Sequence, residues 1–248
     1  MFTNNLSQGK IKKKQFNNII EFAKELISKN EVENYDHNGT GPQVHPIFNL
    51  IKLLGANIPI DYGAYIIKNN PKSLPRIDTE EFLFSIVSEV NKKGEIAYNL
   101  LNEIKTTADI NANLNSDLIL PWVWNRDRLL QSLSRIGENR LFDFWKEDKN
   151  HRLHLWLPMG IFWVEGGNHS ILTGIIQGEG KIIPKKISDI SDIYKYVKCD
   201  GKYFIRIEDN EIISKVQNVE FAAIFEIGRI MIEKNICYKN IVDYSNKV

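Results

Sequence analysis

The first half of the chain shows the spacing of hydrophobic positions that is typical of helices. Between residues 15 and 28, apolar side chains recur every three or four positions, which predicts an amphipathic helix. A polar loop is expected over 30–46, followed by a second helix that begins at Ile47 and stops at Gly55. Two more helices are expected, over 79–90 with Thr79 as its cap and over 95–106.

The second half mixes strand and helix patterns. Bulky apolar residues over 118–124 predict an extended segment, and residues 125–137 predict a short helix that ends at a glycine. Alternation over 153–157, a turn at 158–160 and an apolar return over 161–164 predict a hairpin. Beyond it we expect a short strand at 181–184, a helix over 188–197, a hairpin over 200–216 and a long helix from residue 219.

These patterns together predict an α+β fold. A helical N-terminal region is expected over residues 1–112, and a mixed α+β domain over 113–248. The polar, turn-rich segment 107–117 separates them.

Composition excludes some classes of partner. The 32 Lys and Arg residues nearly balance the 31 Asp and Glu residues, so no global charge draws the chain to nucleic acid or to an anionic membrane. Cys199 and Cys237 are too few for a disulfide framework, which favours a reducing, cytoplasmic location. We find no signal core and no uninterrupted apolar run of membrane-spanning length, so no membrane partner is expected.

The segment 161–180 carries the strongest functional pattern. An apolar run ends at Val164, and helical spacing begins about five residues later. Gly166 and Gly167 can adopt positive φ, and Asn168 is a favoured helix cap. A helix that starts next to glycines exposes its first N–H groups, which predicts an anion site, most often for phosphate.

Three side chains beside this turn could carry chemistry. His169 could donate to a phosphate, transfer a proton or bind a metal, and Ser170 could donate or act as a nucleophile. Glu165 is the nearest carboxylate. The alternative is structural, because a glycine pair followed by asparagine also makes an ordinary tight turn.

Residues 116–186 resemble the ParB/sulfiredoxin-like fold. PWVWNRDRLLQSLSRIG is similar to its early strand and helix, HLWLPMGIFWV to its hairpin, and Gly167-Asn168-His169-Ser170 falls where that fold has a phosphate-binding G-x-H-R box. The pattern is also similar to a divergent bacterial branch with a GGNHS box, from which no function can be carried over. The resemblance implies a nucleotide-phosphate site at this turn.

The chain departs from that family at two positions of the box. Ser170 replaces the arginine that binds phosphate in that family. The missing guanidinium would have to come from Arg126 or Arg128. Asn168 stands where sulfiredoxin has its catalytic cysteine, which excludes sulfinic-acid repair.

Other candidate groups are better explained by structure. His151 and His154 would point to opposite faces of a strand, so no metal site is expected there. Glu226 and Arg229 have the spacing of a helical ion pair. Four tryptophans near the turn favour a core over base stacking: Trp122, Trp124, Trp156 and Trp163.

The leading hypothesis is a nucleotide- or phosphate-binding protein that supports phosphoryl transfer, hydrolysis or a nucleotide-controlled switch, with Mg²⁺ as counterion. Its ligand would be a nucleotide or a phosphorylated small molecule. One alternative is a DNA-associated binding module in plasmid maintenance or phage defence. Another is a non-catalytic interaction protein whose turn is architectural.

Overall fold

The computed structural model describes residues 2–33, 44–69, 71, 82–105 and 110–240. The helices are α1 (Phe2–Glu33), α2 (Ile47–Gly55), α3 (Asn57–Asn69), α4 (Arg126–Arg135), α5 (Asn168–Gln177) and α6 (Val219–Glu233), with 3₁₀ helices at Ala97–Leu100, Ser191–Lys195 and Tyr238–Asn240. The strands are β1 (Asn102–Glu103), β2 (Ala112–Asn113), β3 (Leu118–Leu120), β4 (Arg152–Leu157), β5 (Ile161–Gly166), β6 (Lys181–Ile182), β7 (Lys186–Asp189), β8 (Val197–Cys199), β9 (Tyr203–Arg206) and β10 (Ile212–Lys215). The fold is therefore α+β, as the sequence predicts.

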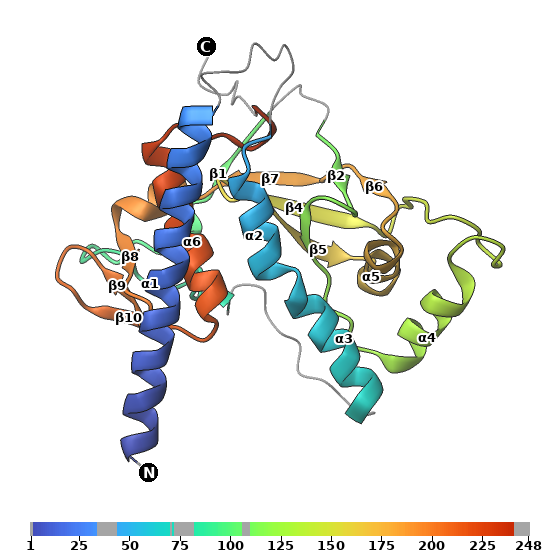
Figure 1. The fold of residues 1–248 in the computed structure, drawn as a ribbon, viewed down its shortest axis with the longest axis horizontal. Coiled ribbons are helices and arrows are strands. Elements are labelled where there is room, and N and C mark those ends of the chain that lie inside the picture. Colours follow the sequence, from blue (N-terminus) through green and yellow to red (C-terminus); the bar gives the residue numbers. More distant parts are fainter. Residues whose placement is uncertain (1, 34–43, 70, 72–81, 106–109, 241–248) are drawn as a thin grey trace.

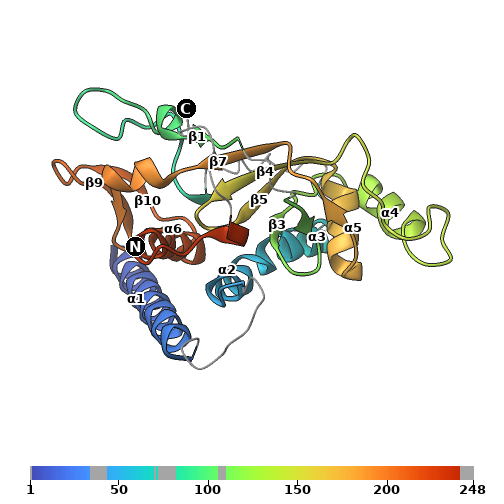
Figure 2. The same ribbon diagram turned by 90° about the horizontal axis from the view of Figure 1, so that it is seen from above.

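A mixed five-stranded sheet forms the centre, in the order β1-β7-β4-β5-β3. The predicted hairpin is present as the antiparallel pair β4–β5, with Leu155 opposite Phe162. β3 pairs with β5 in parallel, and β4 pairs with β7 in parallel. In Figures 1 and 2, α1 runs alongside α6 at one end of the molecule, and α4 lies next to α5 at the other.

The two faces of β5 enter different parts of the core, because successive side chains of a strand point in opposite directions. Ile161 and Trp163 pack in a cluster with residues of α1, α2 and α6. Phe162 and Val164 pack in a second cluster, with Ile171 of α5. The apolar run before the glycines is therefore a strand buried on both faces, and it fixes the place where α5 begins.

Two predicted helices are wrong. Over the described part of 79–90, residues 82–90 contain no α-helix but turns, bends and one isolated bridge, from Glu89 to Ile96, and the predicted cap Thr79 lies outside the described residues. Over 95–106, the described residues form only the 3₁₀ helix Ala97–Leu100 and β1. The N–H groups of Ala97 and Tyr98 donate to the carbonyls of Ser88 and Ile86, so tertiary pairing replaces helical hydrogen bonds.

The predicted helix over 188–197 is partly wrong as well, since residues up to Asp189 belong to β7 and only a 3₁₀ helix follows. The short strand, the second hairpin and the long final helix are confirmed as β6, β9–β10 and α6. The predicted pair on α6 is present, with Arg229 Nε 2.8 Å from Glu226 Oε2.

α3 was not predicted. It follows α2 with only Ala56 between them, and its Pro59 lies in the first turn, where a missing N–H costs no helical bond. By length and composition alone, Ile47–Asn69 could cross a membrane; its most apolar 18-residue window has a mean hydropathy of 1.2 and is 33% buried within the protein. The absence of a membrane partner stays a prediction.

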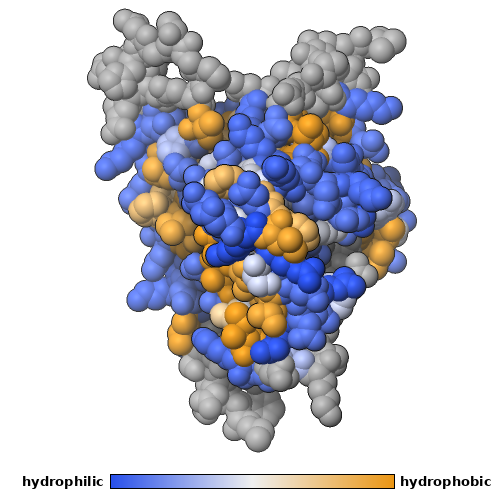
Figure 3. Space-filling model, turned by 90° about the vertical axis from the view of Figure 1, so that its right-hand side faces the viewer, coloured by the Kyte–Doolittle hydropathy of each residue, from blue (hydrophilic) through white to orange (hydrophobic). Residues whose placement is uncertain are grey.

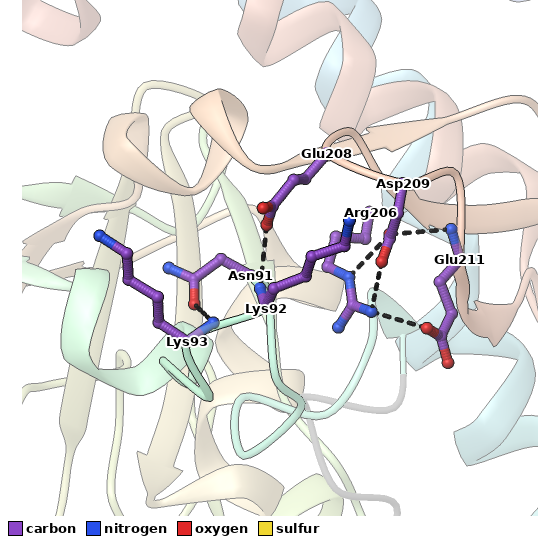
Figure 4. Close-up of polar contacts among 7 residues, drawn as sticks. All are labelled: Asn91, Lys92, Lys93, Arg206, Glu208, Asp209 and Glu211. Carbon is purple, nitrogen blue, oxygen red and sulfur yellow. Dashed lines mark hydrogen bonds and ion pairs between the residues drawn. The ribbon is translucent and has the colours of Figure 1, made fainter.

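The turn between β9 and β10 is held by a charged network (Figure 4). Arg206 donates from Nε and Nη2 to the two carboxylate oxygens of Asp209, at 2.9 and 2.7 Å, and from Nη2 to Glu211 at 2.6 Å. The N–H of Lys92 donates to Glu208 at 2.9 Å. This network ties the hairpin to the loop that follows residue 90.

Candidate functional site

A surface pocket of about 720 Å³ lies between α4, the start of α5 and the segment that leads into β4. We call it the α4–α5 pocket. Its wall includes every residue from Glu165 to Ser170. The turn singled out by the sequence thus faces a concavity of a size typical of small-molecule sites.

The glycine pair is required by close packing as well as by backbone conformation. Gly167 has φ +82°, and a Cβ there would lie 2.3 Å from Cδ2 of His151. A Cβ on Gly166 would lie 2.5 Å from the carbonyl oxygen of Asn150. The residues before β4 therefore pack directly on the turn.

The predicted helix cap is wrong by one residue. Gly167, in the left-handed conformation, is the N-cap of α5, and Asn168 is its first residue. Asn168 Oδ1 instead accepts a hydrogen bond of 2.6 Å from the N–H of Trp122. Its side chain thus joins α5 to the segment after β3, because the glycine conformation already starts the helix.

The beginning of α5 offers free donors to the pocket. The first hydrogen bond of the helix runs from the N–H of Ile171 to the carbonyl of Gly167, at 2.9 Å. The N–H groups of Asn168, His169 and Ser170 precede it, and we see no acceptor for them in the described part of the chain. Such N–H groups, with the partial positive charge of a helix start, favour an anion.

His169 is a neutral hydrogen-bond donor in this site. Its Nε2 accepts the N–H of Asn125 at 3.2 Å, so its proton is on Nδ1. Burial, together with the nearby Arg128, lowers the pKa of His169 to about 4. The residue is only 8% exposed and lines the pocket. It can therefore donate to a ligand, but its second nitrogen is not available as a base.

The Ser170 hydroxyl is held by two donors. His151 Nδ1 accepts the N–H of Asp148 at 2.8 Å, so the neutral ring carries its proton on Nε2, which lies 3.1 Å from Ser170 Oγ. Trp145 Nε1 shares its proton between the Ser170 carbonyl, at 2.8 Å, and Ser170 Oγ, at 3.0 Å. The hydroxyl thus accepts from both side chains, and its own proton is left to donate to a ligand. His151 is thus not arranged as the base that a nucleophilic serine requires.

α4 presents a polar face to the pocket. Arg128, Gln131, Ser132 and Arg135 all line it. Arg128 also lies over the ring of Trp124, 4.9 Å from its centroid. Arg126 does not line the pocket, and its guanidinium lies 3.6 Å from Asp127. Of the two arginines that were predicted to bind phosphate, Arg128 lines the pocket and Arg126 does not.

Two carboxylates complete the wall, Asp148 and Glu165. Within the described ranges, no group of three or more His, Cys, Asp or Glu side chains could hold a metal ion. Magnesium, however, is usually held by one or two carboxylates together with ligand phosphates. Mg²⁺ that enters with a phosphate stays a prediction.

The predicted site residues that meet in the pocket are Glu165, Gly166, Gly167, Asn168, His169, Ser170 and Arg128. Sequence reasoning missed Arg135 and the roles of His151 and Trp145. Arg135 could have been found, because it lies seven positions after Arg128 and so on the same helical face. The His151–Ser170 contact joins distant parts of the chain, and no local pattern signals it.

The remaining candidates lie outside the pocket, except for Trp124, which lines it. His154 is buried, and its Nε2 lies 2.9 Å from Ser188 Oγ. Trp122, Trp156 and Trp163 are buried as predicted, whereas Trp124 is 46% exposed. Trp124 contacts the ring of His169 edge-on, with 5.5 Å between ring centroids, so this one tryptophan is accessible beside the pocket.

Comparison with known proteins adds a family but no activity. Neither the curated proteins nor the solved structures that were searched gave a match to the chain. A family of unknown function, DUF6710, matches residues 3–238, which is nearly the whole sequence. The chain therefore belongs to the DUF6710 family.

Proposed function

We propose that this protein binds the phosphate of a nucleotide or phosphorylated small molecule in the α4–α5 pocket. The observation that carries the proposal is the convergence of donors on one concave wall. The free N–H groups of α5, the Ser170 hydroxyl and the His169 ring all line it, and Arg128 adds a full positive charge. A phosphate oxygen needs such donors, and the geometry provides them before the ligand arrives.

The similarity of residues 116–186 to ParB/sulfiredoxin-like proteins supports the same ligand class. In those proteins the corresponding turn binds nucleotide phosphates, with an arginine where this chain has Ser170. Arg128 lies close enough to His169 to lower its pKa, which supports Arg128 as the substitute. Mg²⁺ would neutralise additional phosphate charge through Asp148 and Glu165.

The arrangement favours Ser170 as a binding group. A nucleophilic serine must pass its proton to a base, and the nearest imidazole is a donor to it. A hydrolytic or phosphoryl-transfer reaction here would need Glu165 or Asp148 to activate water or another hydroxyl. Binding that controls a conformational state requires neither a nucleophile nor a base. We therefore propose binding rather than catalysis as the main function.

The site of action we propose is the cytoplasm. Cys199 and Cys237 are free thiols, which fits a reducing compartment. Fluorescence microscopy of a tagged chain checks this location.

Titration calorimetry with orthophosphate, AMP and ATP, each with and without Mg²⁺, tests the binding. Arg128→Ala is expected to weaken nucleotide binding about tenfold or more, the usual effect of losing a charged hydrogen bond. Arg126→Ala is the matched control, because it removes the same charge from the same helix outside the pocket. Absence of binding by the wild-type protein, or equal weakening by both variants, would contradict the proposal.

A further inference from the structure

The polar face of α4 extends the pocket beyond the start of α5. Arg128, Gln131, Ser132 and Arg135 have the spacing of a single helical face, and all four line the pocket. The two arginines are seven positions apart. At about 1.5 Å per residue, their backbones lie about 10 Å apart along the helix axis. The pocket therefore has positive charge at two separate places.

Each of these places also has an exposed aromatic side chain. Trp124 lies beneath the guanidinium of Arg128, and 46% of its surface is exposed. Phe142 donates its N–H to the carbonyl of Arg135 at 2.8 Å, lines the pocket and is 56% exposed. The pocket wall thus holds two arginines and two exposed aromatic residues, and the guanidinium lies over the ring in the case of Arg128 and Trp124.

Neither guanidinium has an ion-pair partner among the residues that the structure describes. In the described residues, no carboxylate lies within ion-pair distance of Arg128 or Arg135. The pocket volume of about 720 Å³ is in the upper part of the range for small-molecule sites, so it has room for more than one phosphate. Figure 3 faces the side that carries α4 and shows hydrophobic patches among mostly hydrophilic residues.

We propose that the ligand is a two-nucleotide, single-stranded phosphodiester. Its first phosphate binds the start of α5 and Arg128, and its second binds Arg135. The bases stack on Trp124 and Phe142, as in other proteins that bind single strands through aromatic rings and cations. This inference rests on the proposed function, because the first phosphate occupies the same donors.

Titration calorimetry with four probes tests the second subsite: orthophosphate, pyrophosphate, thymidine 5′-monophosphate and the 5′-phosphorylated dinucleotide pTpT. We expect pTpT to bind about tenfold or more tightly than the mononucleotide, from one added phosphate contact and one added stacked base. Arg135→Ala should remove most of this gain and leave the affinity for the mononucleotide unchanged. Phe142→Ala should reduce the gain in part. Arg126→Ala, the exposed control on α4, should leave all four affinities unchanged.

The outcomes separate the two proposals. If none of the four probes binds, both the proposed function and this inference are wrong. If the mononucleotide binds and pTpT gains nothing, or keeps its full gain in Arg135→Ala, only this inference is wrong. If pyrophosphate, and not pTpT, shows the Arg135-dependent gain in affinity, the two bound phosphates are adjacent and the dinucleotide proposal is wrong.

Discussion

At the scale of single residues, the GGNHS turn shows how one sequence pattern serves two purposes. Gly167 starts α5 in a conformation that other residues adopt at a cost, and its missing side chain makes room for His151. His151 in turn orients Ser170. The structural explanation of the turn and the binding explanation are therefore linked, because the packing that requires glycine also fixes the donor hydroxyl.

Gly167→Ala should destabilise the protein more than Gly94→Ala. Both glycines have positive φ, +82° and +77°, so alanine at either position carries a conformational cost of about 1–2 kcal/mol. Only at Gly167 would the new Cβ meet another group, the His151 ring, which is held at both nitrogens; Gly94 has nothing within 4 Å. Urea unfolding of the two variants measures the difference. Equal losses would show that His151 does not restrict this position.

At the scale of elements, the hydrophobic pattern correctly predicted those helices and strands whose ends are marked by turn residues. The β4–β5 hairpin, α5 and α6 have regular periods and turn residues, and they appear where expected. Residues 82–105 do not form the two helices that their hydrophobic spacing predicts. Phe84 packs on Phe204 and Phe225, and the backbone pairs with itself across a turn held by Asn91. Tertiary contacts outweighed helix propensity here, since that propensity amounts to only tenths of a kcal/mol per residue.

The β9–β10 turn should depend on Asp209. The Arg206 guanidinium lowers the pKa of this carboxyl to about 2, and the two side chains are only 12% and 18% exposed. Asp209→Asn removes the two-oxygen contact, so we expect a melting temperature lower by a few degrees and faster amide exchange in β9 and β10. Asp127→Asn is the control, because Asp127 is 80% exposed and 3.6 Å from Arg126. An equal change in both variants would argue against a special role for Asp209.

At the scale of the whole molecule, the hydrophobic core joins both halves of the chain. Ala23 and Ile27 of α1 and Ile51 of α2 pack in one cluster with Trp163 and with Phe225 of α6. The boundary between residues 112 and 113 stays a prediction. Outside these clusters, burial lowers the pKa of His154 and of His169, and this couples global stability to pH.

The free energy of unfolding should fall as the pH is lowered from about 6.5 to about 4. Burial lowers the pKa of both His154 and His169 to about 4, from 6.5 in the unfolded chain. In that window the unfolded state binds more protons than the folded state, so each histidine contributes a loss of about 1.4 kcal/mol per pH unit. His151 acts in the same direction, because burial also lowers its pKa.

Urea unfolding at a series of pH values checks this dependence. His169→Gln should reduce the slope of the unfolding free energy against pH by about 1.4 kcal/mol per pH unit, which corresponds to one proton. This holds whatever the effect of the substitution on stability at neutral pH. A variant with the wild-type slope would mean that His169 is already charged in the folded protein. The loss expected from Asp209 is separate, because it begins below the unfolded carboxyl pKa of 3.8 and continues to about pH 2.

The sequence by itself determined the α+β class and the position of the strand-to-helix turn at residues 165–170. These follow from hydrophobic period and from glycine, which act over a few neighbouring positions. Only the tertiary structure decided that Gly167 is the cap, that Arg128 and Arg135 line the pocket while Arg126 does not, and that His151 and Trp145 hold Ser170. The contacts of Ser170 depend on the distance between segments far apart in the chain, which packing of the core sets and no local pattern encodes. Which face of α4 lines the pocket likewise depends on how α4 packs next to α5.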